Sequence, residues 1–134
     1  MLTAPFPLSS DDATPATLSE TAIRYASPEL IARAESENEP ATLEEDIASD
    51  VYSFGVVCWE MYTRRAPWAN CTTQQIIKAS AALDLLQLPE EVENDDNMDG
   101  MRIVVRSIIQ STMIENAGRR PNMNTIATKL NGFE

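Results

Sequence analysis

The central stretch of the chain, residues 49–56, reads SDVYSFGV. Apolar and aromatic residues continue beyond it to Tyr62, and together they fall on nearly every face of a helix. A helix with that pattern is buried on all sides, whereas a surface helix keeps one polar face. We therefore expect a helix over residues 47–63, and we expect it to be the central element of the fold.

Helical spacing of apolar residues also predicts shorter helices around this centre. They are expected at residues 30–34, from residue 73 to Leu83, at 101–113 and at 123–130. No segment has the alternating pattern of a β-strand, so the expected fold class is mainly α.

Proline and helix-capping residues set the expected boundaries of these helices. Pro28 precedes the first short helix, and the polar residues 35–45 that follow it suggest a connecting loop. The turn Ala66-Pro67-Trp68 ends the central helix, after which Thr72 or Thr73 caps the next one. Asn122 is the expected cap of the last helix. Residues 1–20, rich in Pro, Ser and Thr, are expected to form an irregular strap.

Composition excludes several classes of function. The chain has 134 residues, enough for one domain, and its formal net charge of −11 argues against nucleic acid as a partner. No apolar run is long enough to cross a membrane, and no acidic run has the spacing of a calcium loop. Cys58 and Cys71 suggest neither a disulfide framework nor a zinc site, and no secretory signal is present. We therefore expect an intracellular, cytoplasmic protein.

Three short motifs, taken in order, resemble the second half of a protein-kinase catalytic domain. They are Ser27-Pro28-Glu29, the segment 49–56 and Arg119-Arg120-Pro121. The resemblance covers Thr21 to Leu130 and is closest in style to tyrosine-kinase-like families. It implies part of the helical C-terminal lobe over residues 21–134, preceded by an activation-segment-like strap over residues 1–20. Specificity for Ser/Thr or for Tyr stays open.

The resemblance also implies roles for individual residues. Glu29 is expected to pair with Arg120, because a carboxylate and a guanidinium can satisfy each other away from water. Asp50 is expected to support the catalytic loop of a complete kinase, which is an architectural role. The resemblance also marks Pro28 and Trp68 as structural residues. It places Thr21, Arg24 and Tyr25 in a segment that resembles a substrate-binding loop.

The groups that perform phosphoryl transfer are missing from the sequence. That reaction needs a glycine-rich phosphate loop, a lysine, a catalytic aspartate and metal-binding Asp and Asn residues. The four glycines are scattered, and the chain has no histidine, no Arg-Asp dipeptide and no Asp-Phe-Gly. We therefore predict no catalytic, cofactor-binding or metal-binding residue in these 134 residues. ATP and Mg²⁺ belong to the family and would require the missing lobe.

Three interpretations remain open. The first is a truncated protein kinase domain that is not catalytic as an isolated chain, although its family phosphorylates proteins. Part of the central helix would then lose its cover, which favours self-association or a protein partner at the exposed helix face. The second is a pseudokinase-like protein-binding module. The third is an unrelated acidic helical bundle, which a contact between Glu29 and Arg120 would exclude.

Overall fold

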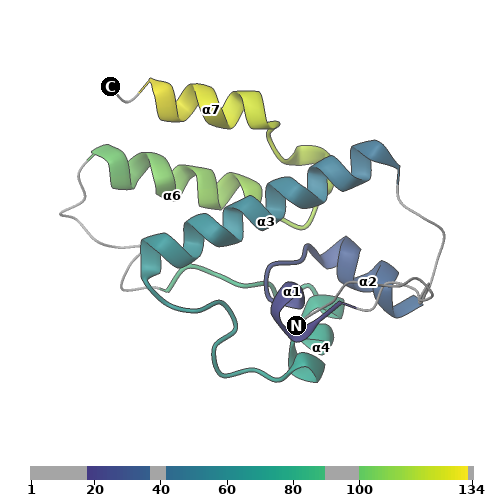
Figure 1. The fold of residues 1–134 in the computed structure, drawn as a ribbon. Helices are drawn as coiled ribbons and strands as arrows, with labels where there is room; N and C mark the ends of the chain where they lie inside the picture. Colours follow the sequence, from purple (N-terminus) through teal and green to yellow (C-terminus); the bar gives the residue numbers. More distant parts are fainter. Residues whose placement is uncertain (1–17, 37–41, 90–99, 133–134) are drawn as a thin grey trace, which may run out of the picture.

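A computed structural model of the chain describes residues 18–36, 42–89 and 100–132. Within these ranges the chain forms helices and no strand, which confirms the mainly α fold class (Figure 1). The helices are α1 (Glu20–Ile23), α2 (Pro28–Ser36), α3 (Leu43–Thr63), α4 (Thr73–Ala81), α6 (Gly100–Thr112), the short 3-10 helix η1 (Ala117–Arg119) and α7 (Met123–Asn131).

Helix α3 is the centre of the molecule, as the sequence predicts (Figure 1). Helices α6 and α7 lie on one side of it, and α1, α2 and α4 lie on the other. Its most extensive partner is α6, and α2 packs mainly against α4. The fold is therefore two groups of helices joined by one long helix.

Each side has its own hydrophobic cluster. The larger one joins α3 to α6 and α7, and its buried members are Val51, Cys58, Trp59, Tyr62, Ile108, Ile109 and Ile126. The smaller one joins α1, α2 and α4 through Ile23, Ala26, Ile31 and Ile76. Burial of this apolar surface is the main stabilising contribution to the fold.

The central helix begins earlier than predicted. Thr42 and Glu45 form a reciprocal capping box, in which Thr42 Oγ1 accepts from the Glu45 amide and Glu45 Oε1 accepts from the Thr42 amide. Residues 43–45 are therefore helical, and residues 35–36 belong to α2. The predicted loop over 35–45 is wrong at both ends, and its middle lies outside the described residues.

The other boundaries agree more closely, with two exceptions. Thr72 caps α4 through a capping box with Gln75, and Asn122 Oδ1 accepts from the Thr125 amide at the start of α7. Helix α4, however, ends at Ala81, and Leu83 follows in the left-handed conformation with φ of 59°. Helix α1 was not predicted. Residues 1–17 of the expected strap lie outside the described residues.

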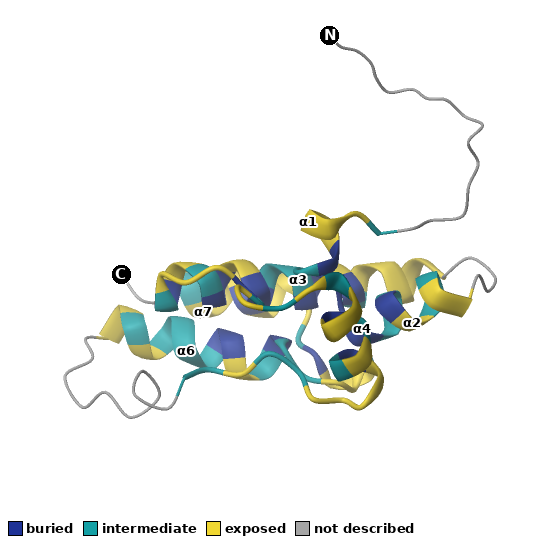
Figure 2. Ribbon diagram, turned by 90° about the horizontal axis from the view of Figure 1, so that it is seen from below, coloured by how far each residue is buried: buried dark blue, intermediate teal, exposed yellow. Residues whose placement is uncertain are grey.

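One face of α3 is open to solvent (Figure 2), so the helix is not buried all round as its apolar pattern alone predicts. The first interpretation likewise expects part of this helix to be uncovered. Exposed or half-buried apolar residues recur on this face at intervals of three to seven positions, namely Leu43, Ile47, Phe54, Val57 and Met61. Met61 keeps 65% of its surface exposed. No described helix is long and apolar enough to span a membrane.

Candidate functional site

A partly buried ion pair between Glu29 and Arg120 joins the start of α2 to the loop before α7. Arg120 Nη1 lies 2.7 Å from Glu29 Oε2, and Nη2 lies 2.9 Å from Oε1, so the pair is bidentate. The Arg120 side chain is only 1% exposed, whereas that of Glu29 is 26% exposed. The contact expected from the sequence motifs is present.

Backbone carbonyls use the remaining donors of Arg120. Its Nε donates to the Ile114 carbonyl at 3.0 Å, and Nη1 donates to the Ala48 carbonyl at 2.9 Å. A weaker bond of 3.4 Å runs from Nη2 to the Glu115 carbonyl. Arg120 therefore ties α2, α3 and the loop after α6 to one another, a role that depends on its planar, multidentate guanidinium.

Two serines extend the network toward α3. Ser27 is fully buried, and its hydroxyl lies 2.8 Å from that of Ser49, which in turn donates to Glu29 Oε2 at 3.1 Å. Ser27 is the first residue of the Ser27-Pro28-Glu29 motif, and its buried hydroxyl has a partner. No buried side-chain polar atom in the described ranges lacks a hydrogen bond.

Burial and the charge of Arg120 act in opposite directions on the pKa of Glu29. Burial raises the pKa of Glu29, but hydrogen bonds and the positive charge of Arg120 outweigh it and hold the pKa below its ordinary value of 4.5. Arg120 also lies 5.1 Å from the centre of the Tyr52 ring. Burial raises the pKa of Tyr52 to about 12, so its hydroxyl stays neutral at physiological pH.

The substrate-loop-like residues lie beside the turn after α3. The guanidinium of Arg24 donates to the carbonyls of Pro67, Trp68 and Cys71, with the last bond at 3.0 Å. Trp68 has a positive φ of 56°, so Arg24 holds a turn in an uncommon conformation. Three hydrogen bonds to backbone carbonyls therefore fix the Arg24 guanidinium at this turn.

Tyr25 is held by contacts with α3. Its hydroxyl donates to Glu60 Oε1 at 2.8 Å, and this bond, together with burial, raises the pKa of Tyr25. Ser53 donates to the Tyr25 carbonyl at 2.8 Å. Thr21 is exposed on α1. Arg24 and Tyr25 are therefore fixed by the fold, whereas the Thr21 side chain faces solvent.

The other structural-motif residues have different environments. Pro28 is buried at the first position of α2, and Trp68 packs against the smaller hydrophobic cluster. Asp50 is exposed on the open face of α3, and no hydrogen bond joins its carboxylate to another described residue. Its expected role in supporting a catalytic loop stays a prediction.

No group of three or more His, Cys, Asp or Glu side chains in the described ranges is placed to hold a metal ion. Cys58 is buried, and its pKa is raised by that burial, which makes it a poor nucleophile.

The family of the chain follows from comparison with known proteins. The model of the protein tyrosine and serine/threonine kinase family matches residues 6–130. The chain belongs to this family. The third interpretation, an unrelated acidic bundle, is therefore excluded both by this match and by the Glu29–Arg120 contact.

Individual relatives are protein kinases or kinase-like proteins. A putative mitogen-activated protein kinase kinase kinase 7-like protein of Drosophila melanogaster is 28% identical over 125 residues, which is 90% of this chain and 28% of that protein. The serine/threonine-protein kinase CTR1 of Arabidopsis thaliana is 31% identical over 61% of this chain and 9% of the kinase. The human mixed lineage kinase domain-like protein is 30% identical over 66% of this chain and 17% of the relative. The chain thus matches less than a third of each.

Sequence reasoning missed the contacts that involve small hydroxyls and carbonyls. Ser27 and Ser49 carry no pattern that would predict their bond, because serine is common in many environments. The partners of Arg24 are main-chain atoms, so no residue type in the turn marks them. Only the paired charges had a recognisable signal.

Proposed function

We propose that this chain forms the substrate-side part of the helical lobe of a protein kinase, and that its 134 residues do not transfer phosphate by themselves. The activity of its family is the ATP-dependent phosphorylation of Ser/Thr or Tyr in proteins. The Glu29–Arg120 pair carries the first part of the proposal, because it assembles this part of the lobe. The second part is supported by the sequence, which has no Arg-Asp dipeptide and no Asp-Phe-Gly. ATP and Mg²⁺ would then bind only where the missing lobe is supplied.

Nucleotide binding tests this proposal directly. A ligand that binds the native state raises its stability, by about 2.7 kcal/mol at a concentration one hundred times the dissociation constant. We expect the purified chain to unfold at the same temperature with and without excess Mg-ATP, and to transfer no labelled phosphate to casein. A complete, active kinase is the positive control. A saturable rise in the unfolding temperature would overturn the proposal.

A second candidate is a pseudokinase-like protein-binding module. The open face of α3 favours it, because an apolar stripe along a helix is a common docking surface for a protein. The occupant is either another copy of this chain or a different protein. Sedimentation of the wild-type chain at increasing concentration tests self-association, and a monomer at all concentrations would leave only the heterologous partner.

The thiols are compatible with a cytoplasmic location. Cys58 and Cys71 are both free, which suits a reducing compartment. The test is thermal unfolding of the chain in reducing buffer and again after addition of a disulfide-forming oxidant. An unchanged unfolding temperature would mean that the fold does not use a disulfide, which supports this part of the proposal.

A further inference from the structure

A cavity of about 490 Å³ lies where α2 packs against α4. One face of α2 forms one wall, with residues three or four positions apart, and the last turn of α4 forms the other. The apolar lining residues are Pro28, Ile31, Ala32, Ile77, Ala81 and Leu83. Its volume falls in the range of about 300–1,000 Å³ that is typical of ligand pockets.

The rim of this cavity is acidic. Glu35, Glu115 and Glu29 all line it; the first two are exposed, and the partly exposed carboxylate of Glu29 is paired with Arg120. No Lys or Arg occurs among the described residues that line it. An apolar pocket with negative charge only at its edge favours a ligand that is apolar in the middle and cationic beside it.

Leu83 provides an independent indication. It has a φ of 59° in the turn that ends α4, where the Asp84 amide donates to the Ala79 carbonyl and the Leu83 amide to the Ser80 carbonyl. Glycine is the usual residue at this position, because a side chain makes the left-handed conformation costly. Leu83 is also 50% exposed, so it gives the fold little burial in return. Its side chain at the edge of the cavity is better explained by contact with a ligand.

We propose that this cavity binds a peptide segment of a partner protein. One or two branched apolar side chains of the peptide enter between α2 and α4 and contact Leu83, while neighbouring Lys or Arg side chains pair with Glu35 and Glu115. A second copy of this chain suits the site poorly, because its own net charge is −11. The surface is separate from the open face of α3, and binding here does not require phosphoryl transfer.

The probe is a fluorescent peptide pool with a fixed design. Two central positions contain Leu, Ile or Val, and the three positions on each side contain Lys or Arg. One comparison pool has Ala in the centre, and another has Glu in the flanks. We expect saturable binding of the basic, apolar pool by fluorescence anisotropy, and weaker binding as salt rises from about 50 mM to about 500 mM.

Variants of the chain locate the binding surface. Ala32→Trp fills the cavity from an exposed helix position, and we expect it to weaken binding by about tenfold or more. Neutralising the rim with Glu35→Gln and Glu115→Gln is expected to weaken binding by about three- to tenfold. Glu20→Gln with Glu44→Gln removes the same charge from exposed positions outside the cavity and is expected to leave binding unchanged.

Each outcome decides the proposal. Thermal unfolding of every variant identifies any that fails to fold, and Ala81→Phe then replaces Ala32→Trp as the filling change. If the Ala-centred pool binds as tightly as the Leu/Ile/Val-centred pool, the binding is due to net charge alone, and the proposal is overturned. Absence of binding by the folded wild-type chain, or equal weakening by the control pair, would also overturn it. A dimer that Ala32→Trp dissociates would assign the cavity to a second copy instead.

Discussion

Gly55 of α3 lies so close to Thr112 of α6 that a Cβ atom at position 55 would clash with Thr112 Oγ1. The same Cβ would meet Thr112 Cβ at 3.0 Å and Met113 Cγ at 2.9 Å. Thr112 is fully buried and its hydroxyl donates to the Ile108 carbonyl at 2.7 Å, so it cannot turn away into solvent. The glycine of the central motif therefore permits the close approach of the two main helices.

We predict that Gly55→Ala destabilises the chain by about 2 kcal/mol, because overpacking outweighs the better helix propensity of alanine. Urea unfolding followed by circular dichroism measures the change. Adding Thr112→Ala is expected to recover part of the loss, since it removes the nearest atom. Gly118→Ala is the control, because that position is exposed and the atom nearest to an added Cβ, Asn116 Oδ1, would be 3.3 Å away. Equal effects at positions 55 and 118 would contradict the packing argument.

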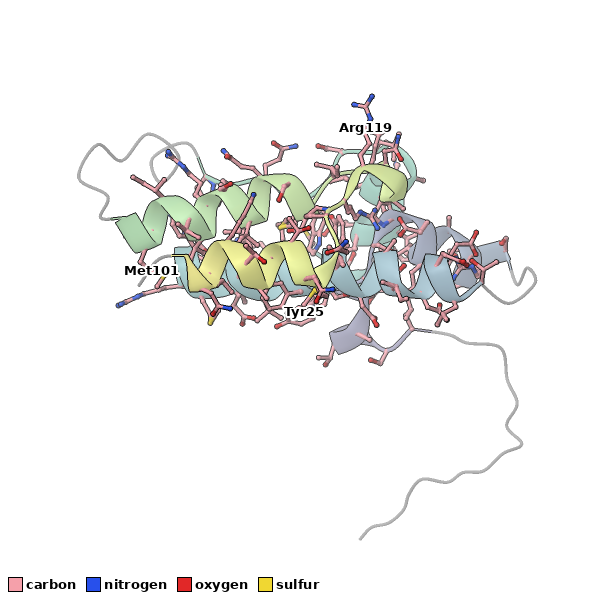
Figure 3. All side chains as sticks on the ribbon, turned by 90° about the horizontal axis from the view of Figure 1, so that it is seen from above. Tyr25, Met101 and Arg119 are labelled. Atoms are coloured by element: carbon pink, nitrogen blue, oxygen red, sulfur yellow. The ribbon has the colours of Figure 1, made fainter. Side chains whose placement is uncertain are left out.

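Removal of Arg120 leaves a partly buried carboxylate without its partner. We predict that Arg120→Ala lowers the free energy of unfolding by about 3–5 kcal/mol. Arg120→Lys is expected to lose a large part of this stability too, because a lysine cannot make the bidentate pair. Arg119→Ala is the matched control, since the neighbouring side chain extends into solvent (Figure 3). A loss within about 0.5 kcal/mol for Arg120→Ala would contradict the role of the pair.

The lowered pKa of Glu29 makes the pair sensitive to acid. The unfolded chain binds a proton on this carboxyl near pH 4.5, whereas the folded chain binds it only at lower pH. The contribution of Glu29 is therefore complete above pH 4.5 and is lost as the pH falls through the folded pKa. We expect Glu29→Gln to reduce the slope of stability against pH in this window. Parallel curves for the two proteins from pH 6 to about pH 3 would count against this assignment.

How far the sequence predicts the fold depends on the kind of interaction. The periodic apolar residues of α3, α6 and α7 predicted those helices because burial follows the helical repeat. The start of α3 was missed because its acidic first turn resembles a solvated loop, although Thr42 and Glu45 have the spacing of a capping box.

Burial itself was the harder property to predict. The pattern of α3 indicates a helix surrounded by other elements, but it does not say which elements the chain supplies. The exposed side chains of Val57 and Met61 show that one side has no cover among the described residues. At the site, the charges of Glu29 and Arg120 indicated their pairing through the resemblance, whereas the carbonyl partners of Arg24 had no signal in the sequence.

The turn after α3 provides a further test. Arg24→Ala removes the donor that the carbonyls of Pro67, Trp68 and Cys71 share. We predict a loss of about 1–3 kcal/mol, with faster hydrogen exchange concentrated in residues 66–72. Arg33→Ala is the control, because its ion pair with Glu45 is long, at 3.7 Å, and partly exposed to solvent. Unchanged exchange in the turn would mean that these hydrogen bonds do not hold it.

The open face of α3 yields the last prediction. Val57 and Met61 are 40% and 65% exposed, so Val57→Lys with Met61→Lys should change the free energy of unfolding by no more than about 1 kcal/mol. If this face drives self-association, the double substitution shifts the chain toward monomer in sedimentation velocity, because the two added lysines oppose burial of the apolar face. Ile103→Lys with Met123→Lys adds the same charge at comparably exposed positions outside α3. Dissociation by the α3 pair alone locates the interface on this face, whereas equal dissociation by both pairs assigns the effect to net charge.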